Sequence, residues 1–184
     1  MLRVRWGDEC AFAELYRRYN RRLLDFFYGM SSNAHTAEDL SHETFARIWQ
    51  VRRKYAATGS FPAYLFTFAR NIWLEDCRRQ RKQWRLGSRR SLDDGPDGVG
   101  YELAAAESYH PDRAAYRAEL SSHILAALDA LPDEQRMVFV MRNVEGLSIT
   151  DIATVLQCPE NTVRSRKILA IKKLRESLRE SLVS

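Results

Sequence analysis

Two arginines flank a serine near the start of the last predicted helix, and these side chains can read nucleic acid. Arg164 and Arg166 can each hold a guanine through two hydrogen bonds, and Ser165 can bond a phosphate oxygen. The surrounding stretch 160–179 has seven basic and two acidic residues. A helical hairpin with a solvated basic face would show the same pattern, so these residues alone leave both interpretations open.

Residues that could support catalysis or bind a metal are not grouped in the sequence. The cysteines Cys10, Cys77 and Cys158 lie far apart and form no Cys-x-x-Cys pair, and the four histidines lack metal-ligand spacing. There is no pairing of a nucleophile with a base and no phosphate-binding loop. The sequence therefore predicts a protein that is not an enzyme and that has no cofactor and no metal site.

Positive charge is concentrated in two parts of the 184-residue chain. Residues 1–87 hold 16 basic and 9 acidic residues, a net charge of +7, and residues 116–184 hold 10 and 9. Residues 88–115 hold 3 basic and 6 acidic residues, so an acidic segment separates the two parts. The overall excess of Lys and Arg, 29 against 24 Asp and Glu, weakly indicates nucleic acid or another polyanion as a partner.

Composition favours the cytoplasm. Three scattered cysteines suit a reducing compartment better than a disulfide framework. The first seven residues lack the apolar run of a signal peptide, and no apolar stretch is long enough to cross a bilayer. We therefore expect a cytoplasmic protein without membrane insertion.

Apolar residues recur every three or four positions along most of the chain, which predicts helices. In the first half we expect three helices. The first covers about 8–30, and the second starts at Thr36 as N-cap with Asp39 as its capping-box partner. The third starts at 61, after a loop at 55–60, and ends in a basic run at 78–85. In the second half we expect helices over about 116–131, 133–143 and 160–182, and a short helix capped by Ser148 with Asp151 as partner. The residues expected to face inward are Leu65, Phe68, Ala69, Ile72 and Trp73 on the helix from 61, and Val163, Ala170, Ile171, Leu174 and Leu178 on the last helix.

No stretch predicts a strand, so the expected fold class is all-α. Residues 87–100 contain four of the eight glycines, one proline and three aspartates, a density typical of a linker. We expect two small helical domains, 1–86 and 116–184, joined by a flexible acidic linker over 87–115. In the second domain, a short capped helix, a turn and a basic helix indicate a helix-turn-helix, whose second helix enters the major groove.

This helix-turn-helix resembles the fourth conserved region of the extracytoplasmic-function (ECF) class of RNA polymerase sigma factors. The similar segments are 146–153 (Gly-Leu-Ser-Ile-Thr-Asp-Ile-Ala) and 158–166 (Cys-Pro-Glu-Asn-Thr-Val-Arg-Ser-Arg). Asn161 replaces a usual glycine, and asparagine also tolerates a left-handed backbone. Leu169 and Ile171 stand where the family often has arginines. The resemblance implies binding of the minus-thirty-five promoter element by Thr162, Arg164, Ser165, Arg166, Lys167 and Lys172.

The amino-terminal half is similar to the second conserved region of the same family. Segment 37–45 followed by Trp49 looks like the helix that docks on core RNA polymerase, which implies contacts with the β and β′ subunits by Asp39, Leu40, His42, Glu43, Arg47 and Trp49. Its charges recur at four-residue spacing near Phe45 and Trp49, a pattern that suits a protein interface, although both aromatic side chains could instead lie in the core.

Segments 61–71 and 76–79 look like the promoter-melting helix of the family. Capture of a flipped base needs a pocket, aromatic stacking and cations that follow the backbone. The aromatic residues Phe66, Phe68 and Trp73 could supply stacking or belong to the core, and for Phe68 and Trp73 we favour the core. The resemblance implies minus-ten DNA contacts by Ala56, Thr58, Ser60, Phe61, Arg70, Asn71, Arg78 and Arg79.

Together these similarities imply a sigma factor that binds core RNA polymerase, directs it to promoter DNA and helps to open that DNA. They also imply an anti-sigma factor as a partner. In the family the linker threads the polymerase cleft, where Asp93, Asp94 and Asp97 would imitate nucleic-acid charge. One alternative is a helix-turn-helix transcription regulator without sigma activity, and another is an enzyme acting on nucleic acid. The amino-terminal half favours the sigma factor.

Overall fold

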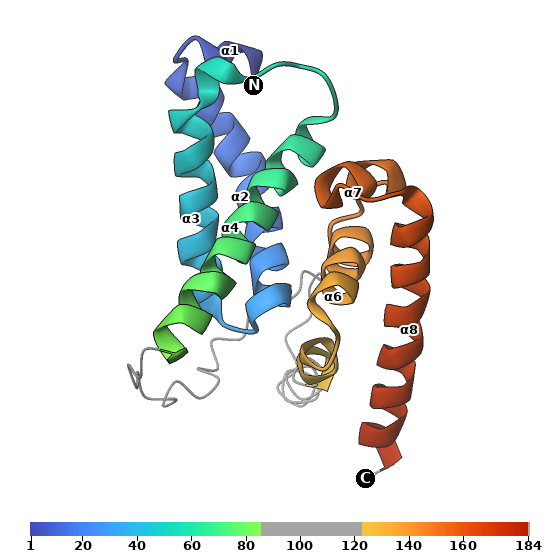
Figure 1. Ribbon diagram of the computed structural model, residues 1–184. Coiled ribbons are helices and arrows are strands. Elements are labelled where there is room, and N and C mark those ends of the chain that lie inside the picture. The colour runs from blue at the N-terminus through green and yellow to red at the C-terminus, as the bar shows by residue number, and fades with distance from the viewer. Residues whose placement is uncertain (86–122, 184) are drawn as a thin grey trace, which may run out of the picture.

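The computed structural model describes residues 1–85 and 123–183, and every regular element in these ranges is a helix (Figure 1). The amino-terminal group comprises α1 (Leu2–Arg5), α2 (Glu9–Ser31), α3 (Ala34–Gln50), the 3-10 turn η1 (Arg52–Lys54) and α4 (Phe61–Arg85). The carboxy-terminal group comprises a helical stretch at 123–129, α6 (Asp133–Phe139), the π-helical turn η2 (Val140–Val144), α7 (Ile149–Leu156) and α8 (Glu160–Val183). The all-α prediction is confirmed, while the predicted linker lies outside the described residues.

Side-chain caps explain where α2 and α3 begin. The Asp8 carboxylate accepts a hydrogen bond from the backbone N–H of Ala11 at 2.8 Å, and this bond lowers the pKa of Asp8. The prediction of Thr36 as the N-cap of α3 is wrong, because the Asn33 side chain accepts from the Thr36 N–H at 2.8 Å instead. The chain turns at Ser32, which has a left-handed φ of 54°, and this turn places the extended Asn33 at the helix start.

The helix-turn-helix has the predicted first cap and an unpredicted turn. Ser148 caps α7 by accepting from the Asp151 N–H at 3.0 Å, which confirms that prediction. Asn161 lies in the first turn of α8, so it does not supply a left-handed residue as the resemblance suggested. Gln157 has that conformation instead, with φ 53°, directly after α7.

The expected single helix over 133–143 is divided. Regular α-helix ends at Phe139, and the wider turn η2 follows. The backbone N–H of Glu145 then reaches the Val140 carbonyl at 3.1 Å. The neighbouring residues Val140 and Met141 are both fully buried in this turn.

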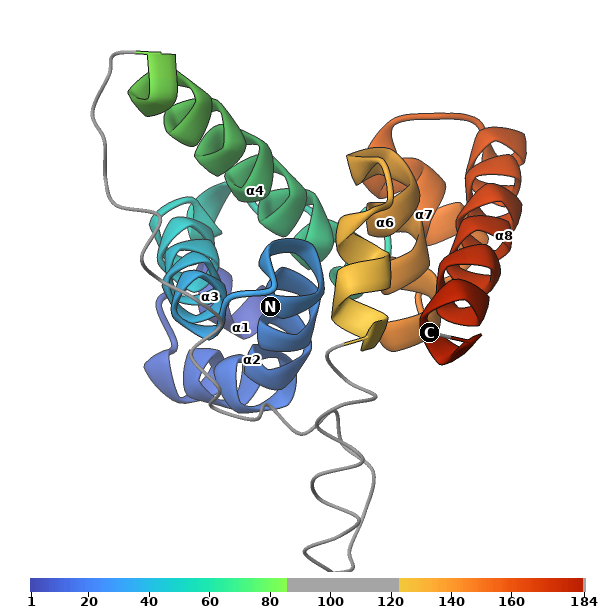
Figure 2. The same ribbon diagram turned by 90° about the horizontal axis from the view of Figure 1, so that it is seen from below.

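The two groups share one hydrophobic core. Buried side chains of α2, α3 and α4 form a continuous cluster with those of α6, η2 and α7, and the groups lie side by side in both views (Figures 1 and 2). A smaller cluster packs 123–131 against α8 through Ala127, Leu128, Leu131, Ala170 and Leu174. The helices that carry the predicted interfaces are therefore held by apolar burial.

Most of the residues predicted to face inward do so. Leu65, Ala69, Ile72 and Trp73 are buried on α4, as are Val163, Ala170 and Leu174 on α8. Phe68 and Leu178 are half-buried and pack against the two clusters, which agrees with their expected inward position. Ile171 is half-buried and belongs to neither cluster, so its expected inward position is corrected. Phe66 is fully buried between the helices, which excludes it from stacking on a base.

Candidate protein and nucleic-acid interfaces

The outer face of α3 presents most of the residues predicted to bind polymerase. Asp39 and His42 are exposed, Glu43 and Arg47 are half-buried, and Trp49 lies near the end of the helix. One correction follows from burial: Leu40 is 3% exposed, so it belongs to the core and offers a partner almost no surface. Phe45 is 4% exposed, which agrees with the alternative that it lies in the core, although it also lines the groove described next.

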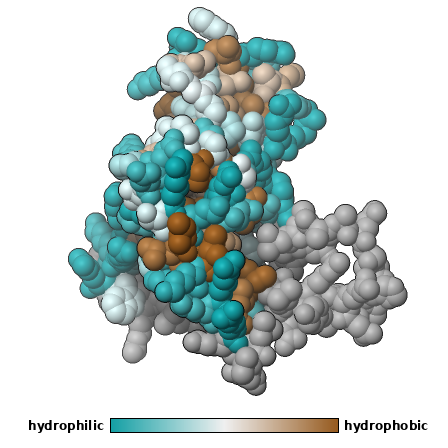
Figure 3. All heavy atoms as spheres, turned by 90° about the vertical axis from the view of Figure 1, so that its right-hand side faces the viewer, coloured by the Kyte–Doolittle hydropathy of each residue, from teal (hydrophilic) through white to brown (hydrophobic). Residues whose placement is uncertain are grey.

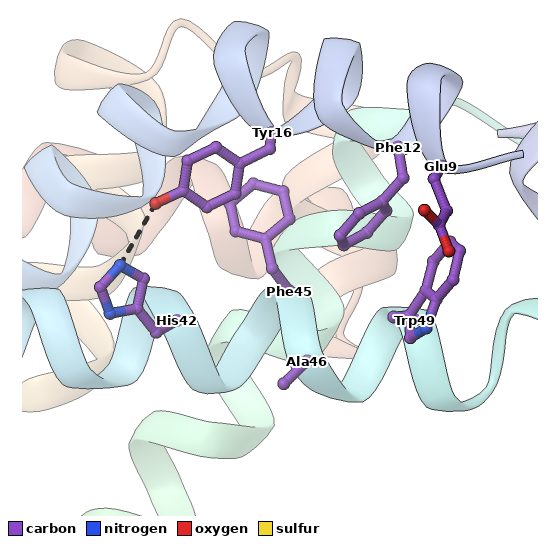
Figure 4. A pocket seen from close by; sticks show the side chains of 7 residues that line it. All are labelled: Glu9, Phe12, Tyr16, His42, Phe45, Ala46 and Trp49. Atoms are coloured by element: carbon purple, nitrogen blue, oxygen red, sulfur yellow. Dashed lines mark hydrogen bonds between the residues drawn. The ribbon is translucent and has the colours of Figure 1, made fainter.

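Next to this face, a shallow groove of about 440 Å³ runs between α2 and α3 (Figure 4). Aromatic side chains make its floor: the Phe12 and Trp49 rings lie 4.8 Å apart, and the Tyr16 and Phe45 rings 4.7 Å apart. The Tyr16 hydroxyl is hydrogen-bonded to His42 Nε2 at 3.2 Å. The full lining consists of Glu9, Phe12, Tyr16, His42, Phe45, Ala46 and Trp49. An apolar floor beside exposed charge suits a protein interface.

An ion-pair network joins α3 to α4. Arg47 on α3 donates to Glu43 Oε1 at 2.5 Å and to Glu75 Oε2 on α4 at 2.6 Å. Arg79 on α4 approaches the second oxygen of Glu43 at 3.5 Å. The hydrogen bond between Arg47 and Glu75 lowers the pKa of the Glu75 carboxyl group and raises the pKa of the Arg47 guanidinium. The network fixes the relative position of α3 and α4, and it engages Arg79 within the protein.

The predicted minus-ten residues gather at the start of α4 and along its exposed side. Ala56, Thr58 and Ser60 lie in the exposed loop before α4, and Ser60 Oγ accepts from the Ala63 N–H at 3.2 Å, which caps the helix. Phe61 is half-buried against Tyr19, with ring centroids 5.0 Å apart. The loop therefore keeps its polar groups exposed while Phe61 anchors it.

Further along α4, two adjacent residues form a polar pair. Arg70 donates to Asn71 Oδ1 at 3.2 Å, and the Asn71 side chain is exposed. The pair leaves the amide nitrogen of Asn71 available to an acceptor on a base edge.

The end of α4 is strongly basic and fully exposed. Arg78 forms no ion pair with any other described residue. Trp84, which was not singled out from the sequence, is 84% exposed beside Lys82 and Arg85. An exposed tryptophan within a basic run can stack on a base, and its position in such a run was the signal available in the sequence.

The first turns of α8 separate the predicted minus-thirty-five residues into two sets. Arg164 and Ser165 are exposed, although Arg164 pairs with Glu160 at 2.9 Å. Arg166 instead turns toward α6, where it forms an ion pair with Glu134. The structure thus brings Arg164 and Ser165 together on one face and directs Arg166 to another.

The remaining predicted residues of α8 are less exposed at its start than at its middle. Thr162 and Lys167 are half-buried, and Lys172 is exposed at 4.0 Å from Glu176. Ile168 and Leu169 are 67% and 47% exposed. On the side of the molecule where α8 lies, hydrophobic surface accordingly appears in patches between hydrophilic side chains (Figure 3). This helix carries less outward charge than a continuous basic helix would.

Within residues 1–85 and 123–183, no three His, Cys, Asp or Glu side chains come together in a way that could hold a metal ion. None of the described helices has the length and apolar character needed to cross a membrane.

Comparison with known proteins identifies both groups. Residues 15–83 match the family "Sigma-70 region 2", and residues 122–174 match "Sigma-70, region 4". The chain is 29% identical to the ECF RNA polymerase sigma factor SigW of Bacillus subtilis over 180 residues, covering 97% of this chain and 92% of SigW. It is 30% identical to SigX of the same organism, another ECF sigma factor, over 95% of this chain and 89% of SigX.

A solved structure shows the same arrangement of helices. The sigma factor RpoE in complex with the anti-sigma factor NepR, from Bartonella quintana, is 25% identical in sequence. It superposes with a TM-score of 0.72 over 92% of this chain and 97% of that one. With both conserved regions matched and relatives similar over nearly their whole length, the chain belongs to the ECF sigma factors, which direct RNA polymerase to promoters and are not enzymes.

Proposed function

We propose that the amino-terminal domain, residues 1–86, binds the β and β′ subunits of core RNA polymerase through the outer face of α3. Support comes from the exposed Asp39 and His42, the half-buried Glu43 and Arg47, and the groove that ends at Trp49. Leu40 contributes by packing and not by contact, because it is buried. The aromatic floor of the groove would supply desolvated contact area, and the surrounding charges would orient the partner.

The same domain recognises and opens the minus-ten element in this proposal. The single observation that carries it is the placement, along one helix, of an exposed polar loop, an exposed amide and a basic end. The loop contributes Ala56, Thr58, Ser60 and Phe61, the helix contributes Arg70 and Asn71, and its end contributes Arg78 and Arg79. A base that leaves the duplex could enter beside the loop and be read by Asn71, while the arginines hold phosphates.

The carboxy-terminal domain, residues 116–184, binds the minus-thirty-five element. Arg164 and Ser165 lie exposed at the start of the second helix of the helix-turn-helix, the part that meets base edges. Thr162, Lys167 and Lys172 add phosphate contacts, and Arg166 joins them once its pair with Glu134 opens. The two DNA elements lie about two helical turns apart, which is about 70 Å along the duplex.

We also infer an anti-sigma factor as a regulatory partner and the cytoplasm as the site of action. The solved sigma factor that resembles this chain is bound to an anti-sigma factor, which supports the first inference. Polymerase and promoter DNA share the cytoplasm, which supports the second. The acidic linker 87–115, proposed to thread the polymerase cleft, lies outside the described residues.

Run-off transcription tests the proposal. Purified chain and core polymerase are incubated with a library of promoter fragments, and the products are sequenced. We expect promoter-specific RNA that disappears with Asn71→Ala and is retained with Glu14→Gln, an exposed control change on α2. Binding to duplex DNA without any specific transcript would instead support a regulator that acts without core polymerase.

A further inference from the structure

The end of the amino-terminal group that carries α1 presents an exposed tryptophan next to positive charge. Trp6 directly follows α1 and is 85% exposed. The Arg5 guanidinium, also exposed, lies 5.7 Å from the centroid of the Trp6 ring. Trp6 therefore contributes little to the core, and its ring is available to a partner.

α1 is held in a defined position on the rest of the group. Val4 is fully buried, and α1 packs against both α2 and η1. Gly7 makes the turn from α1 to α2 with φ 89°, a conformation that favours glycine. The Arg3 guanidinium pairs with the Asp8 carboxylate at 2.8 Å across this turn. Because the turn and the ion pair hold α1 against η1, Trp6 belongs to an ordered surface.

η1 supplies two cations that have no counter-charge. Arg53 and Lys54 are exposed, and neither forms an ion pair with another residue in the part of the chain that the structure describes. Arg52 holds the turn in place: it donates to the Trp49 carbonyl at 2.7 Å, and its guanidinium lies 4.1 Å from the centroid of the Trp49 ring. Adjacent like charges repel each other, so a polyanion bound here would relieve that repulsion.

This basic and aromatic surface continues into the loop before α4. Tyr55 directly follows Lys54; it is buried and packs on Tyr64, with ring centroids 4.9 Å apart. The exposed loop 56–60, which the proposed function assigns to the minus-ten element, begins at the next residue. α1 lies at one end of the amino-terminal group and the basic end of α4 at the other (Figure 1). A DNA strand that runs along α4 to the loop and continues in the same direction therefore meets η1 and α1.

We propose that Arg5, Trp6, Arg53 and Lys54, here called the α1–η1 patch, bind single-stranded DNA that continues beyond the minus-ten loop. Trp6 stacks on an unpaired base, and the three cations hold phosphates. Stacking tolerates every base, so the patch holds the strand without selecting its sequence. Bases in a duplex are already stacked, so Trp6 can act only on opened DNA. The role in promoter opening rests on the proposed function, whereas strand binding by the patch does not.

An anionic lipid surface is another partner that tryptophan and arginine side chains suit. Helices that lie on membranes present an extended apolar face. α1 has only four residues, and its exposed apolar side chain is Leu2, at 59%. Continuity with the proposed minus-ten loop thus favours DNA over lipid.

Fluorescence anisotropy with a labelled single-stranded oligonucleotide of mixed sequence and the full chain tests the proposal. Trp6→Ala removes the stacking ring, and Trp6→Phe keeps a smaller one. Arg53→Gln combined with Lys54→Gln removes two charges from the patch. The matched control combines Arg17→Gln with Arg18→Gln, which removes two exposed charges from α2. Each protein is titrated at several salt concentrations.

We expect Trp6→Ala to raise the Kd about tenfold without changing its salt dependence, and Trp6→Phe to raise it clearly less. The Arg53 and Lys54 double variant should lower the slope of log Kd against log salt concentration by about 1.4, because each phosphate contact on a single strand contributes about 0.7. The Arg17 and Arg18 control should change neither quantity.

Three results would overturn the proposal: no measurable strand binding by the wild-type chain, an unchanged Kd in Trp6→Ala, or equal losses in the two double variants. If Trp6→Ala weakens binding to phosphatidylserine vesicles but not to the oligonucleotide, the patch serves a lipid surface instead. Run-off transcription tests the proposed function separately. Strand binding as expected without promoter-specific RNA would refute the proposed function and keep the patch, whereas specific RNA with strand binding insensitive to Trp6→Ala would refute the patch alone.

Discussion

Glu145 makes the stability of the protein depend on pH. One carboxylate oxygen accepts from Arg22, and the other, Oε1, is buried without a hydrogen-bond partner. Burial raises the pKa of Glu145 from 4.5 to about 7, although the bond from Arg22 acts in the opposite direction. Asp25 raises it further, since a nearby negative charge disfavours ionisation.

The sign and size of the effect follow from this shift. Because the folded state binds the proton more tightly than the unfolded chain, the stability due to protonated Glu145 is fully present below pH 4.5 and is lost as the pH rises through about 7. Each pKa unit corresponds to about 1.4 kcal/mol, so the loss amounts to about 3 kcal/mol between these limits. That is a large part of the roughly 5–15 kcal/mol that holds a typical protein folded.

Glu145→Gln removes this titration and keeps an oxygen that can accept from Arg22. Urea unfolding of both proteins between pH 4.5 and 8 gives the free energy of unfolding, and other titrating groups cancel in the difference. We expect equal stability near pH 4.5 and an advantage for the variant that grows to about 3 kcal/mol at pH 8. A difference that stays constant with pH, while Glu14→Gln behaves like wild type, would refute the assigned role of burial.

Three further predictions separate packing, capping and recognition. Leu40→Ala should lower the free energy of unfolding by about 2–5 kcal/mol, measured by urea unfolding, because it empties a core position. Asp39→Ala changes the exposed face of the same helix, so it should leave stability nearly unchanged. It should instead weaken core polymerase binding in a pull-down assay. Asn33→Ala should lower stability by about 1 kcal/mol through loss of the α3 cap, and Thr36→Ala by clearly less, with equal losses contradicting the cap assignment. Arg164→Ala should weaken binding to minus-thirty-five duplex DNA and reduce its salt dependence, measured by fluorescence anisotropy, and Arg175→Ala, further along α8, should have the smaller effect.

Helix positions and helix caps, which depend on residues close together in the sequence, could mostly be predicted from the sequence. The apolar period of 3.6 residues located the helices, and the spacing from Ser148 to Asp151 located the start of α7. These signals are local, because a helix satisfies its own backbone and a cap reaches only three residues. Even local signals fail where two residues are equally suitable: Asn33 and Thr36 can both cap a helix, and the turn at Ser32 selected Asn33.

Tertiary structure decided which side chains meet and which remain exposed. Arg22 and Glu145 are 123 positions apart, and no pattern along the chain connects them. Burial of Leu40 and Phe45, against exposure of Asp39 and His42 on the same helix, depends on where α2 packs. The turn of Arg166 toward Glu134 likewise depends on the position of α6.

Helix periodicity and the family motifs depend on residues close together in the chain, so they were enough to predict an all-α sigma factor with two helical regions. The accessible parts of the predicted interfaces, and the contact between the loop before α4 and α7, are visible only in the folded molecule. Burial and pairing arise between surfaces that the fold brings together, from residues whose separation in sequence says nothing about their distance in space.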